Sequence, residues 1–94
     1  MNNYEMIVIL KTNLEEDVKS TVLQRLYDII EADGKLGEID DWGNKKLAYE
    51  IQKLSEGNYV LINFEADPSI IKELERRAQI TDQIIKYLVV NKAS

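Results

Sequence analysis

The chain has 94 residues with 12 basic and 17 acidic side chains, a formal net charge of −5 and 45 % hydrophobic residues, which predicts one small globular domain over residues 1–94. Histidine and cysteine are both absent, which excludes thiol nucleophiles, thiolate metal sites and the commonest general base. The longest strictly apolar stretch, Met6–Leu10, is too short for a membrane helix, so we expect a cytoplasmic protein that does not contact a membrane.

The first two elements follow from hydrophobic periodicity. Residues 4–10 are apolar and rich in β-branched side chains, which predicts a strand. Asn13 and Glu16 resemble a capping box, and the helical spacing that follows predicts a helix over residues 14–33. Gly34 is then expected to end this helix as a left-handed residue.

The middle of the chain predicts a pair of strands. Residues 35–51 have a mixed pattern interrupted by glycines, which predicts a long strand that bulges or kinks at a glycine. The polar run at residues 55–58 predicts the turn, and residues 59–64 predict the next strand. The two strands should therefore form a hairpin.

The last part of the chain completes the fold class. Asp67 followed by Pro68 is typical of a helix start, and this helix should end near Gln79. Residues 84–90 predict the final strand. The order βαββαβ predicts an α+β, ferredoxin-like fold, in which a four-stranded antiparallel sheet carries both helices on one face and leaves the other face open.

Strand alternation predicts which side chains lie on each face of the sheet. The residues expected to face the helices are Tyr4, Met6, Val8, Leu10, Val60, Ile62, Phe64, Ile85, Tyr87 and Val89. The residues expected on the open face include Ile7, Ile9, Tyr59, Leu61, Leu88 and Val90. An exposed apolar face is typical of a partner-binding surface, although strands also carry β-branched residues on both faces without any partner.

Several known chemistries do not fit the sequence. Acylphosphatase-like hydrolases share this topology but need an arginine after the first strand, where this chain has Lys11–Asn13. An RNA-recognition motif needs a second aromatic on its third strand, where this chain has Leu61. The acidic residues within Glu38–Asp41 lack the spacing of a cation-binding loop. We therefore predict no enzyme activity, no metal, no cofactor and no small-molecule substrate.

One basic feature lies on the long second strand. Lys45 and Lys46 are close in sequence to Trp42 and Tyr49. Buried aromatic side chains dominate many protein interfaces, and lysines can contribute at the rim. We therefore predict that these four residues contact a protein partner, with burial of Trp42 in the core as the open alternative.

A second basic feature lies at the end of the chain. Lys86 and Lys92 fall in a stretch without carboxylates. Because the last strand of this topology lies beside the first and antiparallel to it, Lys92 should lie near Asn2, Asn3 and Tyr4. This locally positive corner on an acidic protein is typical of a phosphate-binding edge.

Four segments resemble, in this order, the bacterial small-subunit ribosomal protein S6 family: Tyr4-Glu5, Trp42–Ile51, Gly57–Tyr59 and Ile80–Lys86. The resemblance implies a non-enzymatic ribosomal protein that binds the central domain of small-subunit (16S) rRNA together with ribosomal protein S18. It also implies RNA contacts at the start of the first strand and along the last one. In this chain those positions are Asn2, Asn3, Tyr4, Lys86 and Lys92.

A second class of function stays open from the residues alone. A ferredoxin-like regulatory or dimerisation domain that binds a small effector would also use an apolar sheet face. The positive corner distinguishes the two, because an effector-sensing homodimer does not need basic residues where the first and last strands meet.

Overall fold

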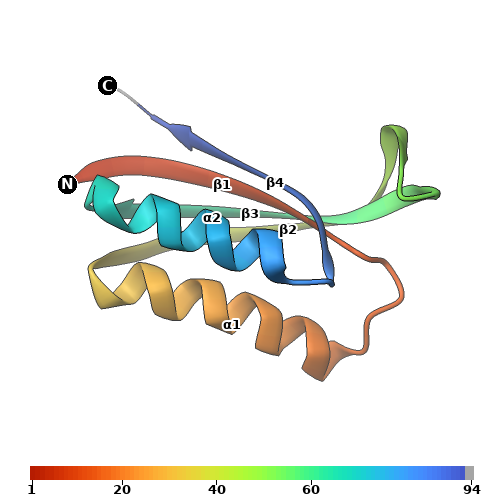
Figure 1. Ribbon diagram of the computed structural model, residues 1–94, viewed down its shortest axis with the longest axis horizontal. Helices are drawn as coiled ribbons and strands as arrows, with labels where there is room; N and C mark the ends of the chain where they lie inside the picture. The colour runs from red at the N-terminus through yellow and green to blue at the C-terminus, as the bar shows by residue number, and fades with distance from the viewer. Residues whose placement is uncertain (93–94) are drawn as a thin grey trace.

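A computed structural model describes residues 1–92 of the chain, so the last two residues of the predicted 1–94 domain lie outside the described part. The elements are β1 (Asn2–Leu10), α1 (Glu16–Ala32), β2 (Gly34–Ile51), β3 (Leu54–Ala66), a 3-10 turn η1 (Pro68–Ile70), α2 (Ile71–Ile80) and β4 (Ile84–Asn91). The strands form one antiparallel sheet in the order β2-β3-β1-β4, and both helices cover the same face of it (Figure 1). The predicted ferredoxin-like fold is confirmed. Across residues 1–92, no helix has the length and apolar character needed to span a membrane.

The core lies between the sheet and the helices, and strand alternation builds it. The strand residues buried there are Tyr4, Met6, Val8, Leu10, Val60, Ile62 and Phe64, as predicted. Leu26 and Ile30 of α1 and Leu74 of α2 meet them, each at most 1 % exposed. Burying a side chain of this size stabilises the fold by roughly 1.5–3 kcal/mol, so these positions carry much of its stability.

The ends of α1 differ from the prediction. The residue that precedes the helix is Glu15, and the predicted capping box of Asn13 and Glu16 does not form. Glu16 and Asp17 instead place negative charge at the positive end of the helix dipole. At the other end, the helix stops at Asp33, and Gly34 is the first residue of β2 with no left-handed conformation.

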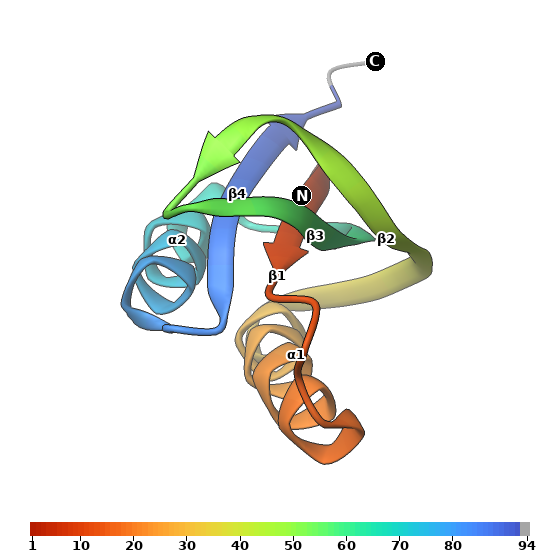
Figure 2. The same cartoon turned by 90° about the vertical axis from the view of Figure 1, so that its right-hand side faces the viewer.

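The β2–β3 hairpin is longer than predicted, and its turn lies earlier. Gln52 and Lys53 form the two-residue turn, with φ angles of 53° and 64°, as a tight hairpin requires. The predicted turn residues 55–58 lie within β3 instead. Figure 1 shows the hairpin tip rising from the sheet on the side away from the helices, and Figure 2 shows β2 arching over that open face.

A register shift changes the start of β4. The pairing of β1 with β4 slips between Ile9 and Leu10, so that Leu10 pairs with Ile84. Ile84 therefore joins the core cluster, whereas Ile85, predicted to be core, is buried outside it. The alternation recovers beyond the shift, and Tyr87 and Val89 pack against the core as predicted.

A polar contact ties α1 to the edge of the sheet. The Lys19 ammonium donates to the Asp41 carboxylate at 2.5 Å, and the side-chain amide of Asn58 and the backbone N–H of Gly43 donate to its other oxygen, both at 2.9 Å. Burial alone would raise the pKa of Asp41, but these hydrogen bonds outweigh that effect and hold the pKa below its ordinary value. Asp41 is thus better stabilised as an anion in the folded chain than in the unfolded one.

We expect Asp41→Asn to lower the free energy of unfolding at pH 7 by about 1 kcal/mol or less, because the carboxylate is half exposed and solvent screens the pair. The folded-state pKa lies below the unfolded value, so the contribution is complete above about pH 4 and disappears as the pH falls through the folded-state pKa. Urea unfolding at pH 7 and pH 2.5 should show the difference shrinking at the lower pH. Glu31→Gln, an exposed change on the same helix, is the control. An equal loss of stability in that variant would contradict a stabilising role for the Lys19–Asp41 contact.

Candidate binding surface on the open sheet face

The centre of the open face is apolar. Ile7 of β1 pairs with Leu61 of β3 and with Leu88 of β4, and Val90 lies two residues further along β4. We call these four residues the apolar stripe. Leu88 and Val90 are 54 % and 42 % exposed. The predicted apolar open face is therefore present, and it is available to a partner.

An aromatic pair lies at the β2 side of this face. The Trp42 ring stacks on Tyr59, with centroids 6.4 Å apart and an interplanar angle of 17°. The Trp42 indole N–H donates to Asp40 at 3.1 Å, and the Lys45 ammonium lies 5.2 Å from the ring centroid. Trp42 is 40 % exposed and lies outside the core. The core alternative for Trp42 is therefore wrong, and the residue is a surface aromatic with a cation beside it.

The curled hairpin brings a second aromatic residue over the same face. Lys86 of β4 lies 5.6 Å from the Tyr49 ring centroid and donates to the Tyr49 hydroxyl at 3.4 Å. Ile9 of β1 lies against Gly57 beneath the hairpin and is buried, although its predicted position on the open face is correct. The structure thus places Lys86, a predicted RNA contact, beside Tyr49, a predicted partner contact.

Lys46 differs from the other predicted partner residues. It lies on the exposed outer part of the β2–β3 hairpin, which we call the hairpin arm, and it pairs in register with Glu56. Lys45 is one residue closer to Trp42 along β2, and its ammonium lies over the Trp42 ring. The four predicted partner residues therefore share β2, but they occupy two locations, one at the aromatic pair and one on the arm.

The predicted positive corner is divided between the two faces of the sheet. The Lys92 backbone N–H donates to the Asn3 carbonyl at 2.8 Å, so the first and last strands meet as expected. Tyr4, however, is 5 % exposed and stacks on Phe64 within the core, with centroids 5.4 Å apart. Its hydroxyl accepts from the Asn2 side-chain amide at 3.3 Å. Only that hydroxyl remains for the predicted RNA contact of Tyr4.

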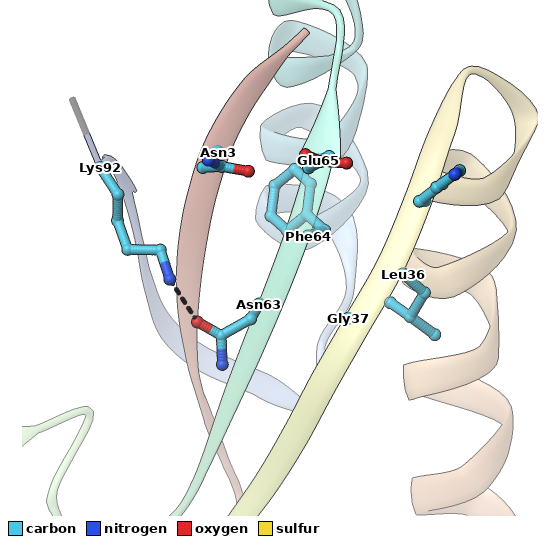
Figure 3. A pocket seen from close by; sticks show the side chains of 8 residues that line it. Asn3, Leu36, Gly37, Asn63, Phe64, Glu65 and Lys92 are labelled. Atoms are coloured by element: carbon cyan, nitrogen blue, oxygen red, sulfur yellow. Dashed lines mark hydrogen bonds between the residues drawn. The ribbon is translucent and has the colours of Figure 1, made fainter. Parts of the chain in front are cut away.

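A pocket of about 280 Å³ opens beside Lys92 on the open face (Figure 3). The Lys92 ammonium reaches across β1 and donates to Asn63 of β3 at 2.9 Å. Asn63 in turn donates to the Glu38 carbonyl of β2 at 3.1 Å. Lys35 also lines this pocket, and no pattern in the local sequence pointed to it. Lys35 could have been placed here only from the register of β2 against β3, which sets Lys35 opposite Glu65.

Lys86 and Lys92 lie at opposite ends of the open face. Lys86 pairs with Ile9 near the end of β1, and Lys92 bonds to Asn3 near its start. Six residues of strand span roughly 20 Å, with the apolar stripe between them. Within residues 1–92, no group of three acidic side chains is arranged to hold a metal ion. The face thus combines an apolar centre with positive charge at its two ends.

Comparisons with known proteins agree on one family. The family model described as ribosomal protein S6 matches residues 3–91. The small ribosomal subunit protein bS6 of Alkaliphilus oremlandii is 46 % identical over 90 residues, covering 96 % of each chain, and that of Alkaliphilus metalliredigens is 43 % identical with the same coverage. The crystal structure of 30S ribosomal protein S6 from Thermotoga maritima superposes with a TM-score of 0.89 and 32 % identity, covering 97 % of this chain and 87 % of that one.

Proposed function

The chain belongs to the ribosomal protein S6 family, whose relatives are components of the bacterial small ribosomal subunit, and from this premise we propose that it binds the central domain of small-subunit rRNA together with ribosomal protein S18. Its role is structural rather than enzymatic. It acts at the ribosome, in the cytoplasm.

The open face of the sheet is the observation that carries the proposal. It combines an exposed apolar stripe with lysines at both ends, on a chain whose net charge is −5. An apolar surface supports contact with a protein, and isolated lysines support contact with phosphate. Membership of a ribosomal protein family supports this proposal over the effector-binding alternative, which no separate observation favours.

The two predicted sites lie mostly on this face. We assign the aromatic end, with Trp42, Tyr49 and Lys45, to ribosomal protein S18, and Lys46 to the rim of the same contact. We assign the opposite end to rRNA, where Asn3 and Lys92 lie on the open face and where the Asn2 side chain and the Tyr4 hydroxyl meet on the helix side of the same strand end. Lys86 lies beside Tyr49, so it contacts rRNA only where the nucleic acid passes the S18 contact.

We expect the isolated protein to bind a central-domain rRNA fragment weakly and the complex with ribosomal protein S18 to bind it clearly. The acidic net charge repels RNA, and few lysines are placed to neutralise phosphates. Each neutralised phosphate contributes a slope of only about −0.7 to −0.9 in a plot of log affinity against log salt, so the contribution of this chain should be shallow. Filter binding over a range of salt concentrations, with and without S18, measures both quantities.

Tight binding of the isolated chain to RNA, with a steep dependence on salt, would contradict this division of labour. It would mean that the chain carries a larger phosphate-binding surface than its exposed lysines provide. Equal binding with and without ribosomal protein S18 would also contradict it. An rRNA fragment from outside the central domain is the control for non-specific attraction.

A further inference from the structure

We propose that the pocket between β1, β2 and β3 is a seat for one phosphodiester group of the RNA backbone, held between Lys92 and Lys35, with Asn63 as the residue that positions Lys92. This inference rests on the proposed function, because it assumes that the nucleic acid lies along this end of the open face. It adds two residues, Lys35 and Asn63, that neither the charge pattern nor the family resemblance connects with RNA.

The direction of the Lys92 side chain is the first observation. Lys92 follows the end of an edge strand, where a lysine side chain ordinarily extends into solvent. Here it turns back across β1, and its ammonium donates to the Asn63 side-chain oxygen at 2.9 Å (Figure 3). An ammonium group has three donors. Within residues 1–92 it makes this one hydrogen bond, so two donors remain for an anion above the pocket.

Asn63 is itself fixed in place. Its amide nitrogen donates to the Glu38 carbonyl at 3.1 Å, which leaves its oxygen facing Lys92. The pairing of β2 with β3 shifts between Leu36 and Ile39, and Glu38 lies within this irregular segment. Gly37 allows the two strands to approach there, because a Cβ at this position would lie 2.9 Å from the Asn63 carbonyl oxygen. The irregularity of β2 and the orientation of Lys92 are therefore parts of one arrangement.

Lys35 supplies the second positive charge, on the other side of the pocket. It pairs with Glu65, and Glu65 pairs with Asn3, so the three form one cross-strand row. Neighbouring strands lie about 4.8 Å apart, which places the backbones of Lys35 and Asn3 about 10 Å apart across the row. Lys35 is exposed, and within residues 1–92 it forms no ion pair with Glu65. Its charge is thus available to a ligand.

The lining of the pocket favours a phosphate over a base. Among residues 1–92, Phe64 is the one aromatic residue that lines it, and it is 3 % exposed with its ring stacked on Tyr4 on the core side. A nucleobase therefore finds no exposed ring to stack on. The available groups are the ammonium groups of Lys35 and Lys92 and side-chain amides. These groups bind an anion but do not distinguish one base sequence from another. The Glu65 carboxylate repels an anion in the pocket. Its removal should therefore strengthen RNA binding, whereas removal of either lysine should weaken it.

The first test measures affinity for a central-domain rRNA fragment in the presence of ribosomal protein S18. We expect Lys35→Ala and Lys92→Ala each to weaken binding about threefold to tenfold and to reduce the magnitude of the log–log salt slope by about 0.7 to 0.9. Glu65→Gln should strengthen binding about twofold, because it removes a negative charge from the seat. Lys72→Ala, an exposed lysine on α2, is the matched control and should change neither quantity.

The second test asks whether Asn63 acts through Lys92. We expect Asn63→Ala to weaken RNA binding several-fold in the wild-type background and to have almost no effect in the Lys92→Ala background. A residue with a merely structural role would weaken binding equally in both. Thermal unfolding of each variant shows whether the fold is kept, and Asn63→Asp gives a second route, because a carboxylate would pair with the ammonium and withdraw it from phosphate.

The outcomes separate this inference from the proposed function. Wild-type affinity and salt slope in Lys35→Ala and Lys92→Ala, with S18-dependent binding intact, would overturn the seat and leave the proposed function standing. Equal effects of Asn63→Ala in both backgrounds would overturn the positioning role. Absence of S18-dependent binding by the wild-type chain would overturn the proposed function and the seat with it.

Discussion

Trp42→Ala is expected to weaken binding of ribosomal protein S18 by about 2 kcal/mol, or about 30-fold, while changing the free energy of unfolding by less than about 1 kcal/mol. The Trp42 ring lies on the open face, 40 % exposed, with Tyr59 on one side and the Lys45 ammonium over it. Truncation therefore removes surface stacking and leaves the core intact. In a complex, the same ring would lie in a desolvated contact, where aromatic side chains contribute most.

Titration calorimetry with purified S18 measures the affinity, and urea unfolding measures the stability. Ile80→Ala is the matched control, because Ile80 is a large apolar residue, 56 % exposed at the end of α2, and it lies on the helix layer rather than on the open sheet face. The control should leave S18 binding unchanged. Unchanged affinity in Trp42→Ala would remove the aromatic pair from the interface. A large loss of stability would mean that the ring supports the fold.

Strand alternation predicted most of the fold because it is a strict geometric rule. Met6, Val8 and Ile62 had to face the helices once their strands were identified, and they do. The rule failed at the start of β4, where the register slips between Ile9 and Leu10. A slip of this kind depends on the length of the preceding loop and on packing, which local sequence does not determine.

The hairpin shows a second limit of local sequence. Residues 55–58 are polar and contain glycine, which is typical of a turn, but the structure turns at Gln52 and Lys53, which have no special turn propensity. The explanation is tertiary. Gly57 is covered by Ile9 and Asn58 donates to Asp41, so the polar run is fixed inside the sheet. The turn at Gln52 and Lys53 therefore comes after the last pair of the β2–β3 ladder, Ile51 with Leu54.

The candidate site was predictable where it depended on strand alternation alone. Alternation along β4 puts Lys86 and Lys92 on the same side as Leu88 and Val90, which is the open face, and both lie there. The curl of the hairpin, which carries Tyr49 to Lys86, depends on long-range packing and was not predictable. Lys35 was missed because its relation to Lys92 passes through two other strands. Alternation also predicted that the Tyr4 ring faces the helices, and it does, so the ring itself is buried away from the predicted RNA contact.

Gly34→Ala is expected to lower the free energy of unfolding by about 3 kcal/mol or more, and Gly43→Ala by about 1 kcal/mol. A Cβ at Gly34 would lie 2.1 Å from the Glu65 carbonyl oxygen and 2.9 Å from Ala66, whose backbone cannot yield cheaply. Gly43 has a φ of +78° but open space around it, so alanine there pays only for the left-handed conformation. Urea unfolding of both variants at pH 7 gives the two values.

The comparison tests how β2 begins. The helical pattern alone predicts that Gly34 ends α1 in a left-handed conformation, and in that case Gly34→Ala would cost about as much as Gly43→Ala. The structure instead pairs Gly34 with Ala66 at the first position of the β2–β3 ladder. A loss near 1 kcal/mol for both variants would therefore support a left-handed helix end at Gly34 and contradict the close approach of the two strands there. A loss at Gly34 several times larger than at Gly43 requires the close approach, because a left-handed residue in open space does not produce it.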